Sequence, residues 1–519
     1  MEGIRADHGS NLAVEHSGRL PLSATALVIC LLLGIGLGLR TLKLSDGLPR
    51  LYNPDEGLLA LPALHIAQSS NLNPGRFEYG SLAIYILAGA DRLASAVGIL
   101  PDLRLLPDYD LTVRNITYPQ PVLFAFDRLV MAVVSLLAVV AVFGVTQRLA
   151  GQRPALFAAG WMAISPLSVT MTRGVTTDAL VQALVACTMW AALWVYERPT
   201  WTRSVLAGAL AGAAASAKYP GVLSVVPLLL AVLWTRARPR RWRLCFGILA
   251  GAAGGFLLTT PYAVLDAPAF LAAVAGQAHD HGVQARNYVE GPSPLYYGRS
   301  LLTSGDGVMT LLSLCGFVLI GRRWPREAII LASFPVLLYV MISDGSPRAV
   351  RYLLPMIPFL AVCAGYAVHI IVGRLNIWHR WLGAIFVVVA FALPLLGLSK
   401  TFHTLYQPDI RDLTAVWVKE NARGVPIATD PYGLPPDAAV GPYVVYGNIV
   451  DLPTQWYIDN GYWIILSDLR RQDANRTWEQ QARLDALDAD PNLEFVTHID
   501  GQIGGLSDSG VTVLRPKRP

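Results

Sequence analysis

The sequence Leu51-Tyr52-Asn53-Pro54-Asp55-Glu56-Gly57 follows the first strongly apolar segment, Leu20–Leu39. It places two adjacent carboxylates beside a segment long enough to cross a bilayer, where burying a charge is costly. Because carboxylates favour a helix N-terminus, a helix cap followed by a first-turn acid explains the pair without any chemistry. The alternative is a general base at Asp55, with Glu56 tuning it or holding a cation.

Composition indicates a polytopic α-helical membrane protein. The chain has 519 residues, of which 54% are hydrophobic and 15% charged, and its mean hydropathy is +0.45. Soluble globular proteins carry about a quarter charged residues. The net charge of +5 is small, and the basic residues lie between apolar segments, which fits the positive-inside rule better than a nucleic-acid surface. The five cysteines have no metal or redox spacing.

A crossing helix needs about 20 apolar residues to span roughly 30 Å of hydrocarbon. Such windows recur along the chain, and we expect about 11–13 transmembrane helices. They are Leu20–Leu39, Gly80–Leu100, Leu129–Val145, Ala155–Met171, Ala179–Tyr196, Val205–Ala217, Val222–Trp234, Leu244–Thr260, Leu301–Ile320, Ala328–Ile342, Leu353–Ile371 and Trp381–Leu398.

The last part of the chain has a different character. From residue 400 to 519, charged residues, Pro and Gly become frequent and no spanning window remains, so we predict a separate water-soluble domain. Its helix-like segments (410–421 and 478–487) alternate with strand-like ones (426–429, 463–467, 493–497 and 511–514). This alternation predicts a small α/β domain that follows a transmembrane domain of residues 20–399.

Basic clusters predict the orientation, because basic loops stay on the cytoplasmic side. On this basis the tail (1–19) is cytoplasmic, whereas Asp178, Lys218, the loop 261–299, the segment 344–351 and the C-terminal domain lie outside. The clusters are Arg148 with Arg153, Arg198 with Arg203, and the segments 236–241, 322–326 and 374–380.

This count fails before residue 130. An even number of windows cannot join a cytoplasmic tail to an outer C-terminal domain, so one early segment is miscounted or lies in the interface. The weakest candidates are the segment 55–68 and the loop 101–121. In the first outer loop (43–79), residues 57–68 place Leu58, Leu61 and Leu64 on one helical face, and the segment is too short to span. It predicts an interfacial helix on the membrane.

Further charged residues are predicted at membrane depth on the outer side. Asp178 follows Thr177 at the start of a window, where either residue could simply cap a helix. Lys218-Tyr219 lies between two windows, where snorkelling to the interface competes with a contact to phosphate. Arg351-Tyr352 lies on the side where positive charge is sparse, and an anionic partner such as a lipid phosphate is the simplest reason.

Other polar groups favour structural readings. His279 and His281 form an H-x-H pair in an outer loop, and structure or substrate hydrogen bonding is favoured over metal binding because no third ligand is identifiable. Asp127-Arg128 opens an apolar window, which favours a local or interhelical ion pair.

The ordered set of motifs resembles a family. Pro54-Asp55-Glu56 after a first span, Asn73-Pro74 with Tyr79, and Arg173 through Asp178 are similar to the GT-C membrane glycosyltransferases. More narrowly, they resemble the dolichyl-phosphate-mannose–protein mannosyltransferase and bacterial aminoarabinose-transferase group. Further matches follow in order: Lys218-Tyr219, the His-containing outer loop, the segment 351–355, and the junction 409–417.

The resemblance implies a bacterial plasma-membrane enzyme that moves a sugar from a polyprenyl-phosphate donor to an acceptor hydroxyl on a lipid, glycan or protein. The reaction would take place at the extracytoplasmic face with inversion. Asp55, Glu56 and Asp178 would be the catalytic acids and bases. Lys218, Tyr219, Arg351, Tyr352 and Arg128 would hold the donor phosphate and lipid, and Tyr79, Arg173, His279 and His281 would contact sugar or acceptor. No residue is assigned to a metal; a divalent cation is left open.

Two other classes of function stay open. The first is an envelope lipid or glycan transporter or flippase, since membrane charges also mark substrate pathways. Transporters usually show two related halves, and no such repeat is visible in the sequence. The second is a non-catalytic envelope scaffold or polysaccharide-binding protein whose working part is the C-terminal domain.

Overall fold

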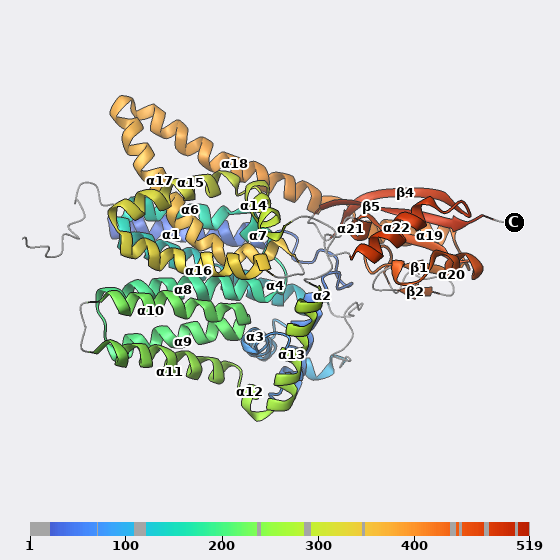
Figure 1. Cartoon of the computed structure of the whole chain (residues 1–519), viewed down its shortest axis with the longest axis horizontal. Coiled ribbons are helices and arrows are strands. Elements are labelled where there is room, and N and C mark those ends of the chain that lie inside the picture. Colours follow the sequence, from blue (N-terminus) through green and yellow to red (C-terminus); the bar gives the residue numbers. More distant parts are fainter. Residues whose placement is uncertain are drawn as a thin grey trace, which may run out of the picture.

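The computed structural model describes residues 21–69, 71–107, 121–235, 240–284, 292–344, 348–435, 443–445, 449–471, 477–503 and 507–517. Long helices pack side by side into one bundle, and a smaller unit containing a β-sheet lies beyond one end of it (Figure 1). The bundle elements are α1 (Leu22–Thr41), α2 (Pro54–Gln68), α3 (Leu82–Ala96), η1 (Leu103–Leu105), α4 (Pro121–Ser135), α5 (Leu137–Ala150), α6 (Gln152–Ile164), α7 (Pro166–Met171), α8 (Thr177–Glu197), α9 (Trp201–Ala217), η2 (Tyr219–Ser224), α10 (Val225–Trp234), α11 (Arg241–Thr259), α12 (Tyr262–Leu265), α13 (Ala267–Gln284), α14 (Ser293–Thr303), α15 (Gly307–Arg323), α16 (Pro325–Asp344), η4 (Val350–Met356), α17 (Ile357–Trp378) and α18 (Arg380–Tyr406).

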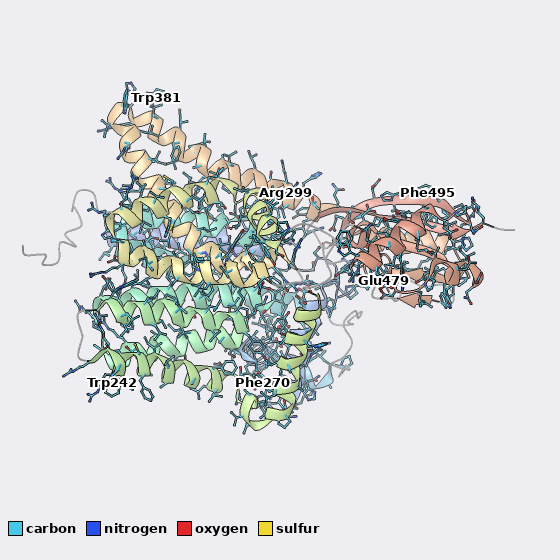
Figure 2. The ribbon with its side chains drawn as sticks, viewed as in Figure 1. Trp242, Phe270, Arg299, Trp381, Glu479 and Phe495 are labelled. Carbon is cyan, nitrogen blue, oxygen red and sulfur yellow. The ribbon has the colours of Figure 1, made fainter. Side chains whose placement is uncertain are left out.

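The predicted apolar windows are all largely helical, so the polytopic helical fold is confirmed. Among the described residues, seven helices are long and apolar enough to cross a membrane, or eight if the bent pair α14 and α15 forms one span. The other windows are shorter or broken helices, such as α9 with 17 residues and α6 with 13. Trp242 and Trp381, which adjoin two of the basic clusters, both lie at the end of the bundle away from the sheet (Figure 2).

Helix α3 occupies the predicted window at residues 80–100. Its 15 residues extend about 22 Å at 1.5 Å per residue, short of the roughly 30 Å hydrocarbon thickness. It packs chiefly against α2 at the end of the bundle that faces the sheet (Figure 1). Helix α3 is therefore too short to cross the hydrocarbon as a straight helix, as are α6 and α9, and the number and orientation of the crossings stay predictions.

Helix α2 also departs from its prediction. It is short, as expected, but most of its residues are buried inside the protein, including Leu59, Leu61 and Leu64. Gln68 donates from Nε2 to the carbonyl oxygens of Leu103 and Leu106 at 2.7 and 2.9 Å. Because α3, η1 and neighbouring segments cover the helix, its leucines pack inside the protein.

Arg40, near the C-terminal end of α1, is fully buried among polar groups from α6 and α7. Its Nε donates to Thr172 Oγ1 at 3.1 Å, and its terminal nitrogens donate to Ser168 Oγ and to three carbonyl oxygens at 2.8–3.4 Å. All five N–H groups of a guanidinium are thereby used. Two of those carbonyls belong to Met162 and Ala163 at the end of α6, and Ser168 lies in α7. Arg40 therefore links the end of α6 to α7 through hydrogen bonds.

Asp91 of α3 forms a buried carboxyl pair with Asp127 of α4. Burial raises the pKa of Asp91 to about 7, whereas an unfolded Asp titrates near 4. Between these values the folded protein binds a proton that the unfolded chain has lost. The pair therefore makes the free energy of unfolding fall as the pH rises from about 4 to about 7.

Replacing Asp91 by Asn tests this pair. We expect a higher Tm than wild type at pH 8, by a stabilisation on the order of 3 kcal/mol, and little difference at pH 4. The Asn amide carries no charge to bury. Thermal unfolding in detergent at both pH values measures the effect, with Asp102→Asn as the control. An equal shift at the two pH values would contradict a pH-dependent cost of burying the Asp91 carboxyl group.

The C-terminal unit contains α19 (Ile410–Asn421), β1 (Ile427–Thr429), β2 (Tyr443–Val445), η6 (Ile449–Asp451), α20 (Thr454–Asp459), β3 (Trp463–Ser467), α21 (Asp468–Arg471), α22 (Trp478–Ala489), β4 (Leu493–Ile503) and β5 (Ser507–Pro516). The sheet order is β2-β1-β3-β5-β4. β1 runs parallel to β2 and β3, and β5 runs antiparallel to β3 and β4. The small α/β fold is confirmed, although β2 was not predicted and α18 continues to Tyr406, through the boundary expected at residue 400.

Candidate active site

Four charged side chains from four separate segments converge at the end of the bundle that faces the C-terminal unit. Arg351 pairs with Asp55 Oδ2, and its Nε lies 4.0 Å from Asp178 Oδ2. Lys218 Nζ lies 2.7 Å from Asp178 Oδ1. The side chain of Asp178 is only 4% exposed, whereas that of Arg351 is 31% exposed. Two carboxylates and two cations thus form a neutral cluster with one open side.

Local sequence explains how each group reaches the cluster. Asn53 caps α2 by accepting from the Asp55 backbone N–H at 3.1 Å, which puts Asp55 in the first helical turn. Asp178 likewise occupies the first turn of α8. Lys218 lies at the break after α9, where Pro220 ends the α-helix, and Arg351 lies in the 3-10 turn η4 before α17. All four side chains therefore come from the ends of helices or from breaks between them.

Aromatic rings surround the cations. The Lys218 ammonium lies 4.8 Å from the ring centre of Tyr352 and 5.9 Å from that of Tyr79. Burial and then the nearby charge of Asp55 raise the pKa of Tyr79, so its hydroxyl stays protonated. Tyr352 also lies 5.9 Å from the Arg351 guanidinium. These contacts fix the cations by cation–π attraction while leaving their N–H groups able to bind an anion.

Glu56 and Arg128 form a buried ion pair next to the cluster. Arg128 donates to both carboxylate oxygens of Glu56 at 2.8 and 2.6 Å and to the carbonyl oxygens of Leu44 and Asp46 at 2.5 and 2.8 Å. Glu56, 1% exposed, also accepts from the Val175 N–H at 3.0 Å. The ion pair expected for Arg128 is present. It joins the first loop, α2, α4 and the segment before α8.

This pairing bears on the roles predicted for Glu56 and Arg128. Both side chains are enclosed and bonded to each other, so we now propose that they position the loop around Asp55 instead of contacting the donor. Arg173 donates to the Leu42 carbonyl oxygen at 2.6 Å, which also holds the first loop.

We expect Arg128→Met to leave Glu56 as an unpaired buried charge and to cost about 3–5 kcal/mol of stability. The double variant Glu56→Leu with Arg128→Met removes both charges and should recover most of that loss. Thermal unfolding in detergent distinguishes the two. If the double variant were as unstable as the single one, the charge pairing would not be the cause.

Three residues that were predicted to belong to the site are not seen in this cluster. Tyr219 donates from its hydroxyl to the Phe77 carbonyl oxygen at 2.6 Å and packs edge-on against Phe270. His279 is exposed on α13. The side chain of His281 lies outside the described residues. Among the described residues, no group of three or more His, Cys, Asp or Glu side chains could hold a metal ion.

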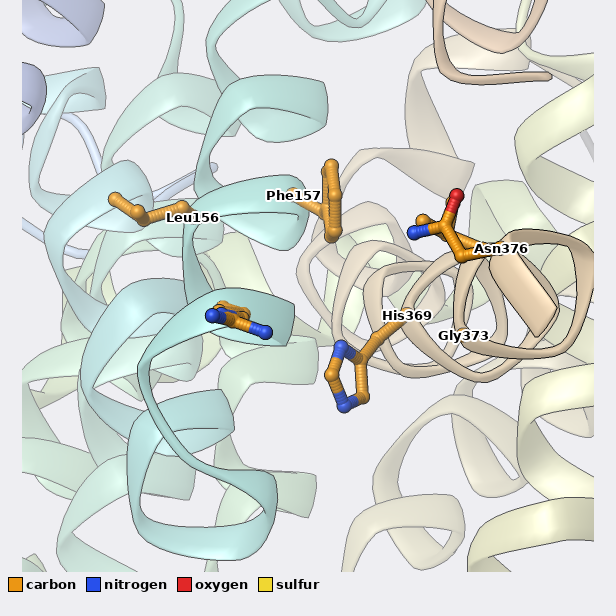
Figure 3. A pocket seen from close by; sticks show the side chains of 7 residues that line it. Leu156, Phe157, His369, Gly373 and Asn376 are labelled. Atoms are coloured by element: carbon orange, nitrogen blue, oxygen red, sulfur yellow. The ribbon is translucent and has the colours of Figure 1, made fainter. Parts of the chain in front are cut away.

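A separate cavity of about 220 Å³ lies between the start of α6 and the end of α17. His369, Asn376 and Phe157 project around it (Figure 3). Because α6 starts and α17 ends beside two of the basic clusters, this cavity belongs to the opposite end of the bundle and forms no part of the candidate active site.

Residues 126–265 match the family model described as dolichyl-phosphate-mannose-protein mannosyltransferase. The archaeal oligosaccharyltransferase AglB from Archaeoglobus fulgidus, solved with an inhibitory peptide and a dolichol-phosphate, is 12% identical. It aligns over 86% of this chain and 70% of its own, with a TM-score of 0.57. The chain has the GT-C glycosyltransferase fold. No curated protein sequence matches the chain.

A second GT-C structure is ArnT from Cupriavidus metallidurans bound to undecaprenyl phosphate. It is 14% identical and covers 95% of this chain and 98% of its own, with a TM-score of 0.48. The sequence did not predict the buried charges of Arg40 and Asp91 or the contacts of Tyr52 with the C-terminal unit. Arg40 and Asp91 could have been noticed in the sequence, since each is a charged residue inside or beside an apolar segment.

Proposed function

We propose that this protein is a membrane glycosyltransferase that moves a sugar from a polyprenyl-phosphate donor to an acceptor hydroxyl at the outer face, with inversion. The observation that carries the proposal is the convergence of Asp55 and Asp178 on Lys218 and Arg351. Such a cluster combines a candidate base with cations that suit a phosphate, inside the GT-C fold. The dolichol-phosphate bound to AglB supports a lipid-phosphate donor.

Lys218 and Arg351 are proposed to bind the donor phosphate. They supply N–H donors that would stabilise the negative charge on the departing phosphate. Both cations are held by acidic partners and aromatic rings, so little rearrangement is needed when the phosphate leaves the anomeric carbon.

Asp55 is proposed to take the proton of the acceptor hydroxyl. Its ion pair with Arg351 occupies the carboxylate while no donor is bound. A donor phosphate that binds Arg351 would compete with this pair and leave the carboxylate free to accept the proton of the acceptor hydroxyl. The base would thus be activated only when the donor is in place, which protects the site from premature reaction with water.

Asp178 is proposed to hold the two cations at the right spacing. It contacts Lys218 directly and lies near Arg351, while its own side chain is almost completely buried. Attack by the acceptor on the face of the anomeric carbon opposite the departing phosphate would invert the configuration of the sugar. This arrangement requires Arg351 to leave Asp55 when it binds the phosphate.

Mass spectrometry of envelope glycans and lipid-linked sugars, with and without the gene, tests the proposal. We expect one glycan to lose a sugar and the corresponding polyprenyl-phosphate sugar to accumulate. Purified protein in detergent should transfer that sugar without any ion gradient. Transport without transfer would favour the flippase alternative instead.

A further inference from the structure

The C-terminal unit contacts the first outer loop at two positions ahead of Asp55, namely Arg50 and Tyr52. Tyr52 donates from its hydroxyl to Asp412 Oδ1 at 2.5 Å, and Arg50 pairs with the same carboxylate. The Arg411 guanidinium lies 3.5 Å from the ring centre of Tyr52 and donates to the Tyr52 carbonyl oxygen at 3.2 Å. Tyr52 is therefore held through its ring, its hydroxyl and its backbone.

The residues of the C-terminal unit that contact Tyr52 are themselves held by hydrogen bonds. Arg411, 2% exposed, donates to both oxygens of Asp409 at 2.8 and 2.7 Å. Asp409 caps α19 by accepting from the Arg411 backbone N–H and forms a β-bridge with Gln502 of strand β4. The start of α19 is thus tied to the edge of the sheet, and Tyr52 is bound by a rigid surface.

The linker from the bundle is anchored on the same loop. Lys43 donates from Nζ to the Leu405 carbonyl oxygen at 2.8 Å and lies over the Tyr406 ring. Gln502 donates from Nε2 to the Gln407 carbonyl oxygen at 3.2 Å. The end of α18, the linker and α19 therefore present one continuous surface to residues 43–52.

We propose that Tyr52, Arg411 and Asp412 are positioning residues, through which the C-terminal unit fixes the orientation of Asp55. Asp55 lies between two anchors in the chain: Tyr52 is held by the C-terminal unit, and Glu56 is held by the bundle. Asn53 connects them by capping α2. Releasing the first anchor lets the start of α2 move, although no group that touches substrate is removed. This inference rests on the proposed transferase function.

The test uses the full-length protein with Tyr52→Phe, Asp412→Ala and the double variant. Each single variant loses the hydrogen bond between Tyr52 and Asp412, so we expect each to lower kcat roughly tenfold, since a misplacement of about 1 Å can cost up to about 100-fold. The double variant should be no worse than the poorer single one. KM for the donor and the Tm should stay near wild type, because Lys218 and Arg351 are untouched.

Matched controls come from the same unit. Tyr457→Phe removes a buried hydroxyl that donates to the Ile449 carbonyl oxygen, and Asp488→Asn breaks a surface pair with Arg471. Both should leave kcat unchanged. Wild-type kcat in Tyr52→Phe and Asp412→Ala, or losses that multiply in the double variant, would overturn the positioning role. Absence of transfer by the wild-type protein would instead overturn the proposed function.

Discussion

Replacing Asp55 by Asn should abolish sugar transfer while leaving donor binding intact. Removing a general base costs roughly 100- to 10,000-fold in rate. The Asn amide fills the same space and keeps its place in the first turn of α2, so the fold should persist. Because Asn no longer competes for Arg351, donor affinity should be equal to or slightly higher than that of wild type.

Single-turnover transfer and direct binding of a polyprenyl phosphate separate these effects. Asp102→Asn, which alters a carboxylate that caps η1, serves as the matched control and should keep full activity. Unchanged turnover in purified Asp55→Asn would exclude Asp55 as the base. Loss of donor binding together with activity would mean that Asp55 supports the phosphate site instead.

Replacing Lys218 by Met should raise KM for the donor and lower kcat/KM by roughly 100- to 1,000-fold, the usual cost of losing one donor to a developing negative charge. Met retains most of the stem that packs between Tyr79 and Tyr352. The variant leaves Asp178 without its closest cation, which also lowers stability.

A second variant separates these two losses. In Lys218→Met with Asp178→Asn, no buried carboxylate is unpaired, so the Tm should recover while donor binding stays weak. Lys419→Met, which removes a surface cation on α19, provides the matched control and should transfer sugar normally. Recovery of activity along with Tm would show that Lys218 serves folding alone.

The sequence predicted the elements of this fold well, because local patterns determine them. The helix at residues 410–421 and the strand at 463–467 have the predicted bounds. Counting basic loops predicted that Asp178, Lys218 and Arg351 share one side of the membrane. In the structure these side chains lie together with Asp55, although Asp55 and Arg351 are 296 positions apart. Charge at membrane depth is costly enough to be informative by itself.

What the sequence did not predict depends on partners that are distant in the chain. Helix α2 was predicted to be interfacial because it is short and carries leucines on one face, whereas Gln68 at its end donates to the carbonyl oxygens of Leu103 and Leu106. Nothing near Glu56 indicates that Arg128 will neutralise it. Nothing near Tyr52 in the sequence indicates that its hydroxyl will bond to Asp412, because hydrophobic periodicity carries no information on contacts between distant segments. These contacts have a consequence for truncation. Removing the chain after about residue 400 should abolish transfer although no catalytic group is lost. Loss of function in such a truncation would therefore not favour the alternative that the protein is a non-catalytic scaffold.

Arg40 has a consequence for the order of assembly during synthesis. Its partners outside α1 lie 122–132 residues further along the chain. When α1 enters the bilayer, none of them has yet been inserted, and the guanidinium must stay hydrated near the membrane surface. Only when α6 and α7 arrive can it be enclosed. The first helix therefore reaches its final position only after α6 and α7 are inserted. Until then, α1 exposes a basic group that would mark an incomplete bundle for quality-control machinery.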